Sequence, residues 1–294
     1  MASVCLIVPF FAQISPFFWK NNPKAYRFPN YFDHFVESFS KTKGVDLKIF
    51  TNIPSEPYKE KYQGNISFYQ MSLNQFFRLA VKQIGFNPGQ FYPYQFGLRI
   101  YSSFYGYKIC DFKPAFGVIF SDFLKGYEFW GYCDIDMIIG NLGKFFRDDN
   151  VQKYDLITVP GNIAGYMALY RNTESMNNLF RTSPDYLKVF ESPKNYIFDE
   201  YGREDIVAMK QILKKGEVKV HYMENLVHND CGIMNLDRDW KYRWENGTLI
   251  DTLADLEVGA FHIVKTKKAP DFVIEPLVRN QPFEVTKKGI RAVS

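Results

Sequence analysis

The chain has 294 residues, of which 46% are hydrophobic and 23% charged, and a formal net charge of +4 at pH 7. This composition allows a large core in one domain and argues against global disorder. The charge is too mild to require a nucleic-acid partner, although it would help to hold anionic substrates or an anionic membrane surface.

An apolar run at the start of the chain predicts a central, buried strand of a parallel sheet. The run extends from Val4 to Phe11 and is interrupted by Pro9. Ligands of open α/β sheets bind beyond the carboxyl ends of such strands. Pro9, Phe10 and Phe11 are therefore candidates to border a nucleotide, and a buried strand end without a ligand is the alternative.

Helical and strand patterns then alternate along the chain. This order predicts an α/β fold with a mainly parallel sheet that is flanked by helices. The aromatic segment 87–107 is either a flap over a site or a packed loop. The expected elements are helices over 30–41 (capped by Asn30 or Asp33) and 74–84 (capped by Asn74 and ended by Gly85), and strands over 46–52 and 66–71.

Two carboxylates, Asp134 and Asp136, follow a buried strand predicted over residues 127–133. Side chains two residues apart on a strand point to the same side, so these like charges need a compensating partner. A hard divalent cation takes oxygen ligands and can in turn bind a diphosphate. The alternative is an ordinary pair of acidic residues that faces water at a strand end.

A helix is predicted from Pro114 to about Lys125, directly before this strand. Asp111 and Lys113 precede the helix and are expected beside the same sheet edge. A helix N-terminus with a nearby lysine favours anions, while a helix cap with a solvated lysine is the alternative.

Acidic residues also precede a helix predicted over residues 206–213. The helix dipole favours acidic residues at this position. A carboxylate that faces a metal–diphosphate cleft can also act as a general base. The four carboxylates are Asp199, Glu200, Glu204 and Asp205.

The C-terminal half is expected to contain a small antiparallel sheet. Asn246-Gly247 between two strand-like runs is a strong hairpin signal. A later strand carries His262 and runs into a basic cluster with Lys265 and Lys267. The imidazole could complete a metal shell and a lysine could neutralise phosphates, while a core histidine with satisfied hydrogen bonds is the alternative.

The cysteines and the N-terminal run indicate a cytoplasmic protein. Cys5, Cys110, Cys133 and Cys231 show no paired spacing, which is typical of reduced thiols. The first apolar run is too short for a signal peptide, and no stretch reaches the length of a membrane span. Peripheral contact with the inner membrane surface is compatible with the charge.

Three segments together resemble a glycosyltransferase of the GT-A type: Val8-Pro9-Phe10 at the end of the first strand, Asp134-Ile135-Asp136, and Phe261-His262 followed by lysines. The block over 111–142 is also similar to bacterial and large-virus glycosyltransferases that build surface polysaccharides or lipopolysaccharide. The resemblance spans about 4–268, and its specific parts are the D-x-D motif and the His–Lys segment.

The resemblance implies a metal and a nucleotide site. Asp136 and His262 would bind Mn²⁺ or Mg²⁺ directly, and Asp134 would contact the ribose or reach the metal through water. Lys265 or Lys267 would contact the diphosphate of a nucleotide-diphosphate sugar, the donor.

The resemblance also assigns donor and acid–base roles. Asp111 and Lys113 would contact the donor sugar or base. Glu204-Asp205 resembles the E-D motif of inverting members, so Asp205 is the first candidate base, with Asp199 and Glu200 as rivals. The Gly and Trp of the His-x-x-Gly-x-x-Lys-Pro-Trp segment of retaining families are absent here.

The expected activity is metal-dependent, inverting transfer of a sugar to a hydroxyl of a glycan or lipid-linked acceptor, without nucleic acid. One domain, 1–294, is expected, with a nucleotide-sugar half (1–140), an acceptor and catalytic half (141–268) and an extension (269–294). A sugar-nucleotide nucleotidyltransferase is one alternative, although the position after the first strand lacks its Gly-rich basic loop. A carbohydrate-binding protein, which needs no metal, is the other.

Overall fold

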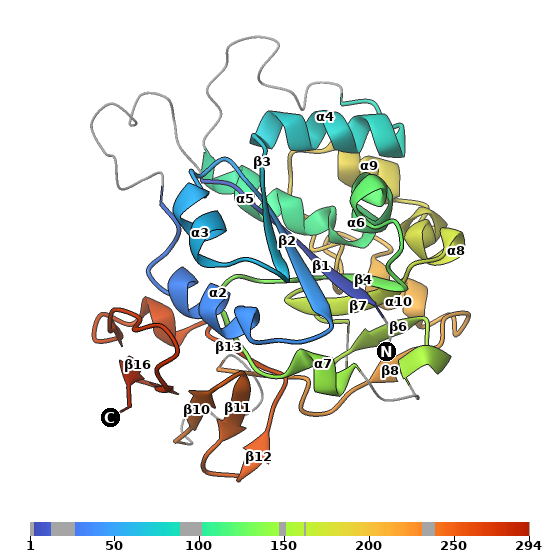
Figure 1. The fold of residues 1–294 in the computed structure, drawn as a ribbon. Helices are drawn as coiled ribbons and strands as arrows, with labels where there is room; N and C mark the ends of the chain where they lie inside the picture. Colours follow the sequence, from blue (N-terminus) through green and yellow to red (C-terminus); the bar gives the residue numbers. More distant parts are fainter. Residues whose placement is uncertain are drawn as a thin grey trace.

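The protein is described by a computed structural model that covers residues 3–12, 27–88, 102–146, 151–161, 163–230 and 239–293, without the side chains of 102–106. A seven-stranded sheet lies at its centre (Figure 1). Four strands at one side pair in parallel, and the next two pairings are antiparallel. The predicted mainly parallel sheet is therefore confirmed. In spatial order the strands are β3 (Ile66–Gln70), β2 (Val45–Thr51), β1 (Val4–Phe10), β4 (Phe129–Cys133), β7 (Met167–Arg171), β6 (Leu156–Thr158) and β8 (Val220–Tyr222).

Helices cover both faces of this sheet, as Figure 1 shows. The helices are α2 (Phe32–Ser40), α3 (Glu56–Lys61), α4 (Leu73–Ile84), α5 (Ser102–Asp111), α6 (Phe116–Ile119), α7 (Leu142–Phe145), α8 (Glu174–Asn177), α9 (Tyr186–Glu191) and α10 (Met209–Leu213). Single 3₁₀ turns are η4 (Lys113–Ala115), η5 (Ser121–Phe123), η6 (Val151–Lys153), η7 (Leu179–Thr182) and η8 (Thr266–Lys268).

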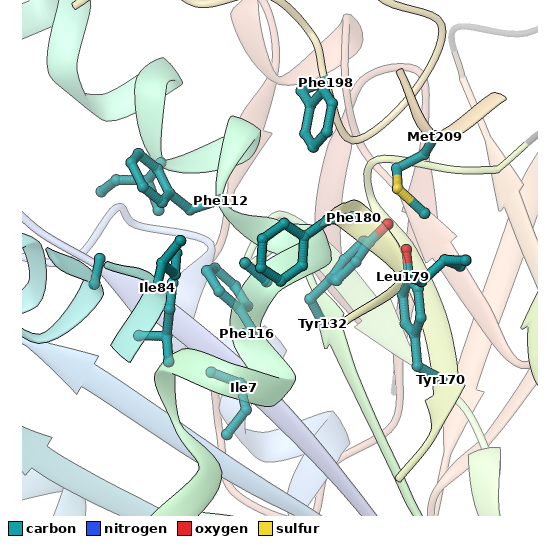
Figure 2. Packing of buried hydrophobic residues seen from close by; sticks show 14 of the residues in the cluster. Ile7, Ile84, Phe112, Phe116, Tyr132, Tyr170, Leu179, Phe180, Phe198 and Met209 are labelled. Carbon is teal, nitrogen blue, oxygen red and sulfur yellow. The ribbon is translucent and has the colours of Figure 1, made fainter. Parts of the chain in front are cut away.

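Strand β1 is buried on both faces. Leu6 joins a hydrophobic cluster with α2, whereas Ile7 joins the cluster with α4, α5, α6 and α10. Figure 2 shows the second cluster, in which Phe116 and Phe180 lie among the residues that cover the sheet. Burial on both faces explains why the sequence of this strand is continuously apolar rather than alternating.

A three-stranded sheet continues directly from the central one. β4 ends at Cys133, and β5 (Met137–Ile139) pairs antiparallel with β13 (Ala260–His262), which pairs in parallel with β9 (Val227–Asn229). His262 lies opposite Met137 in this pairing. The tripeptide Asp134-Ile135-Asp136 is therefore the junction between two sheets, and His262 is brought to it by strand register.

A six-stranded, mostly antiparallel sheet forms the C-terminal part, as predicted. Its order is β12 (Leu256–Glu257), β11 (Thr248–Asp251), β10 (Lys241–Glu245), β15 (Phe283–Thr286), β16 (Gly289–Ala292) and β14 (Val273–Ile274). Asn246 and Gly247 connect β10 and β11 with φ angles of 49° and 86°, the left-handed pair that a tight hairpin requires. Among the described residues, no helix combines the length and the apolar character that a bilayer crossing needs.

Three helix predictions were inaccurate for local reasons. Ser72 rather than Asn74 caps α4, because its hydroxyl and the Gln75 side chain form a reciprocal capping box. The N-cap of α2 is Tyr31 rather than Asn30 or Asp33, and its side chain forms no capping hydrogen bond with the helix. Residues 114–125 form η4, α6 and η5 instead of one helix.

The predicted helix over 206–213 begins only at Met209. Ala208 has an extended backbone and its N–H donates to the side chain of Gln211, so the helix starts at the next residue; Glu204 and Asp205, with φ angles of 55° and 59°, lie in the turn before it. Most of the segment 87–107, for which a flap and a packed loop were the alternatives, lies outside the described residues, apart from 87–88 and the start of α5.

Candidate functional site

A cavity of about 220 Å³ lies where the chain reverses its direction across the central sheet. From β1 the chain adds β2 and β3 on one side, and it then returns to add β4 on the other. Ligands of open α/β sheets bind in the crevice at such a switch point, beyond the carboxyl ends of the strands. Residues of the ends of β1 and β4, together with Lys113, line the cavity: Val8, Pro9, Phe10, Asp134 and Asp136.

Phe11 is not brought to this cavity. Its side chain is buried in the core, where its ring lies 5.9 Å from that of Phe76. Of the three residues predicted to border a nucleotide, Pro9 and Phe10 therefore line the cavity, and Phe11 packs in the core.

Asp134, Asp136 and His262 form a compact group, called here the Asp–Asp–His cluster. One ligand atom of each lies within 4.8 Å of the others. His262 Nε2 is 3.0 Å from Asp136 Oδ1 and 3.9 Å from Asp134 Oδ2. The backbone N–H of Ile263 donates to the carbonyl of Asp136 at 2.9 Å, which fixes the two strands at this point.

Two lysines compensate the two carboxylates. Lys113 Nζ lies 2.8 Å from Asp134 Oδ1 and donates to the carbonyl of Gly165 at 2.6 Å. Lys267 forms an ion pair with Asp136, and its ammonium lies 5.4 Å from the centroid of the Tyr31 ring. Lys265 is exposed, so of the two predicted phosphate ligands Lys267 is the one at the cluster.

The pKa values follow from burial and neighbouring charge. Burial lowers the pKa of His262, which Asp134 opposes, so the imidazole is neutral and keeps a lone pair. Burial lowers the pKa of Lys267 to about 8. Burial also acts to lower the pKa of Lys113, but neighbouring acidic groups, Asp134 first, outweigh it and raise the pKa.

The Asp–Asp–His cluster fits a divalent cation. Two carboxylates and a neutral imidazole are the donor set that suits Mn²⁺ and Mg²⁺ in a site with open positions. The ammonium groups of Lys113 and Lys267 also demonstrate that the carboxylates accept positive charge at this location.

Among the predicted bases, Asp199 and Glu200 lie next to this cluster. Glu200 Oε1 accepts from the backbone N–H of Gly165 at 2.8 Å, and Gly165 is the residue whose carbonyl accepts from Lys113. Burial raises the pKa of the Asp199 carboxyl to about 8, which Lys113 opposes. Asp205 is exposed, and no contact within the described ranges joins it to the cluster.

Asp111 does not reach the cavity, contrary to the expected contact with the donor. Its side chain is completely buried and forms an ion pair with Lys108 at 2.8 Å. Its oxygens also accept backbone N–H groups of Tyr196 and Phe198. The preceding residue, Cys110, lines the cavity instead.

Asp230, which was not among the residues predicted from the sequence, holds the loop between His262 and Lys267. Its carboxylate accepts the backbone N–H groups of Val264 at 2.7 Å and Thr266 at 2.8 Å. These partners lie more than 30 residues later in the chain, so no local pattern marked Asp230.

Residues 25–275 match a family of unknown function (DUF6625). No curated protein matches the chain. Solved structures that resemble the fold include galactosyltransferase LgtC in complex with donor and acceptor sugar analogues, with 11% identity, 91% of this chain and 88% of that chain covered, and a TM-score of 0.41.

Two further structures show a likeness of similar size. Mouse xyloside xylosyltransferase 1 is 9% identical, with 92% of this chain and 99% of that chain covered and a TM-score of 0.46. The glycosyltransferase GlyE of Streptococcus pneumoniae is 11% identical, with 77% and 46% covered and a TM-score of 0.36. TM-scores below 0.5 indicate too distant a likeness to assign a function.

Proposed function

The chain belongs to a family of unknown function (DUF6625), and we propose that it is a metal-dependent glycosyltransferase. Its donor would be a nucleotide-diphosphate sugar and its acceptor a hydroxyl group of a glycan or lipid-linked sugar. One observation carries the proposal: the Asp–Asp–His cluster lies beside a cavity at the switch point of the sheet, flanked by two lysines.

The donor would lie with its diphosphate at the cluster. A bound Mn²⁺ or Mg²⁺ would supply a Lewis acid and a sink for the charge of the leaving diphosphate. Asp136 and His262 would hold it directly, and Asp134 would contact the ribose or a bound water. Lys267 would exchange its partner from Asp136 to a phosphate oxygen, an interaction that strengthens as the leaving group gains charge.

Glu200 is the base that we propose. One of its oxygens is held by the N–H of Gly165, and the other accepts no hydrogen bond from the described residues. Glu200 is half-buried, so an acceptor hydroxyl can reach it, whereas Asp199 is almost completely buried. Gly165 links Glu200 to Lys113, because its N–H donates to Glu200 and its carbonyl accepts from Lys113. This link to the cluster favours Glu200 over the exposed Asp205.

The experiment is a screen of nucleotide sugars for metal-dependent hydrolysis and transfer, with Asp136→Asn beside the wild type. We expect turnover that requires Mn²⁺ or Mg²⁺ and that Asp136→Asn abolishes while the fold is kept, because the variant loses a direct ligand. Turnover that persists in excess chelator, or in Asp136→Asn, contradicts the proposal.

Calorimetry separates the proposed enzyme from a carbohydrate-binding protein. We expect UDP, used as the nucleotide probe, to bind more tightly with Mn²⁺ than without it. A protein that only binds carbohydrate would ignore both UDP and the metal, and a nucleotidyltransferase would form a nucleotide sugar from a sugar phosphate and a nucleoside triphosphate.

A further inference from the structure

Helix α5 carries a completely buried ion pair that the proposed chemistry does not use. Lys108 and Asp111 lie one helical turn apart, with 2.8 Å between Nζ and Oδ2 and side chains that are 0% exposed. Neither residue lines the cavity. A buried ion pair rarely stabilises a fold more than apolar residues of the same volume, so its partners indicate its use.

The partners of this ion pair belong to one segment, residues 189–198, which comprises the end of α9 and the first part of the connection to α10. Lys108 Nζ donates to the carbonyls of Val189 at 2.6 Å and Lys194 at 2.9 Å, which uses its remaining protons. Asp111 accepts the backbone N–H groups of Tyr196 and Phe198, each at 2.9 Å. Residues 192–198 contain no helix or strand, so the ion pair supplies the hydrogen bonds that regular structure would otherwise provide.

The backbone is strained at the point where it meets Asp111. Ile197 lies between the two donating residues and has a φ of 53°. This left-handed conformation is a true outlier for a β-branched side chain, and it persists only where the surroundings impose it. The strained residue allows both neighbouring N–H groups to converge on one carboxylate.

Asp199 and Glu200 directly follow Phe198, the second residue that donates to Asp111. Both carboxylates lie against Gly165: a Cβ added there would be 2.8 Å from Asp199 Oδ2 and 2.7 Å from Glu200 Oε1. Gly165 also accepts from Lys113, which follows α5 by two residues and is bound to Asp134. The end of α5 is thus connected to this site in two ways: Asp111 binds the backbone just before Asp199, and Lys113 binds Gly165.

We propose that Lys108 and Asp111 are positioning residues, which hold Asp199 and Glu200 beside the Asp–Asp–His cluster through the strained turn at Ile197. This inference rests on the proposed function, because it assigns a task to residues that support the proposed base. Neither Lys108 nor Asp111 would touch a substrate.

The test removes the ion pair without leaving a lone buried charge, in the variant Lys108→Met/Asp111→Asn. We expect kcat to fall about 10- to 100-fold, since a displacement near 1 Å of a reacting group has an effect of that size. The affinity of the Mn²⁺–UDP complex, measured by calorimetry, should stay within about twofold, because the metal and diphosphate ligands are untouched. Asp185→Asn is the matched control, because Asp185 also accepts a backbone N–H, that of Val207 at 2.8 Å, but within the described ranges it forms no hydrogen bond with residues 195–198.

A second readout is independent of activity. The N–H of Gly165 donates to Glu200 and makes no contact with Asp111, so its hydrogen exchange reports where the carboxylate lies. We expect exchange at Gly165 to become about tenfold faster in the double variant and to stay unchanged in Asp185→Asn. If the double variant does not fold, Ile197→Pro abolishes the left-handed conformation without a buried charge, because proline fixes φ near −65°, and should shift both readouts in the same direction.

Wild-type kcat together with wild-type exchange at Gly165 would overturn the proposal. An equal loss of kcat and of Mn²⁺–UDP affinity would also overturn it, because that result indicates general distortion. If the wild-type chain transfers no sugar, the proposed function fails by itself, and exchange at Gly165 alone then decides whether the ion pair positions Glu200.

Discussion

Replacing Lys267 by Met should strengthen the binding of a divalent cation in the absence of nucleotide. The ammonium of Lys267 is bound to Asp136, so a cation must displace it. The two side chains are 16% and 13% exposed, which puts the ion pair between an exposed and a fully buried one. Its net free energy is therefore about 1–2 kcal/mol, and the dissociation constant for Mg²⁺ alone should fall about 5- to 30-fold.

The pH dependence of Mg²⁺ binding checks independently that the charge of Lys267 weakens this binding. Burial lowers the pKa of Lys267 to about 8, so the side chain loses its proton as the pH rises through that value and then competes less. Wild-type affinity for Mg²⁺ alone should therefore increase between about pH 7 and pH 9, and Lys267→Met should be flat over that range. Calorimetric titration with Mg²⁺ at several pH values measures both effects.

Lys265→Met is the matched control, because it removes the same charge from an exposed side chain two residues away. It should leave Mg²⁺ affinity almost unchanged, whereas Lys267→Met should also weaken UDP binding in the presence of metal. Equal tightening in both variants would reduce the effect to long-range charge and refute the reasoning. So would weaker Mg²⁺ binding by Lys267→Met.

Three further predictions address the surroundings of the site. Gly165→Ala should lower kcat about 100-fold, because the added Cβ would lie 2.8 Å from an oxygen of Asp199 and 2.7 Å from one of Glu200. The affinity for Mn²⁺–UDP, measured by calorimetry, should not change, and a parallel loss of affinity would contradict the prediction. Asp230→Asn should reduce the free energy of unfolding by about 1–3 kcal/mol and weaken Mn²⁺–UDP binding, because the loop between His262 and Lys267 loses a buried acceptor. Denaturant unfolding measures the stability and calorimetry the affinity, and wild-type values of both would refute the prediction. Gly247→Ala should lower the free energy of unfolding by about 1 kcal/mol, since Gly247 has a φ of 86°. It should leave kcat unchanged in transfer assays, and a fall in kcat would show that the C-terminal sheet contributes to the site.

Features that depend on neighbouring residues could be predicted from the sequence. The apolar run before Asp134 identifies a buried strand, and parallel strands present their carboxyl ends at one edge. The Asn246-Gly247 turn requires left-handed backbone, which these residue types favour. The mainly parallel sheet and the C-terminal antiparallel sheet followed from such local signals.

Features that depend on distant partners could not be predicted. The acidic pattern at Glu204-Asp205 resembled a helix start, but both residues have a left-handed backbone in a turn, the helix begins only at Met209, and Asp205 is exposed. Asp111 looked like a residue of an open sheet edge, yet its partners come from a segment some 85 residues later in the chain, at Asn195, Tyr196 and Phe198. Such pairings are set by tertiary packing, which carries no signature in a short window of sequence.

The junction between the two sheets makes the three arms of the cluster unequal in how firmly they are tethered. Asp134 and Asp136 are joined by a single intervening residue, so their Cα atoms can never separate by more than about 7 Å. His262 lies 126 residues after Asp136, so strand pairing and the contact between the two side chains, rather than a short stretch of chain, keep it beside Asp136. A chain that opens partially at its C-terminal half would therefore lose the imidazole first and keep a weak, two-armed grip on a cation.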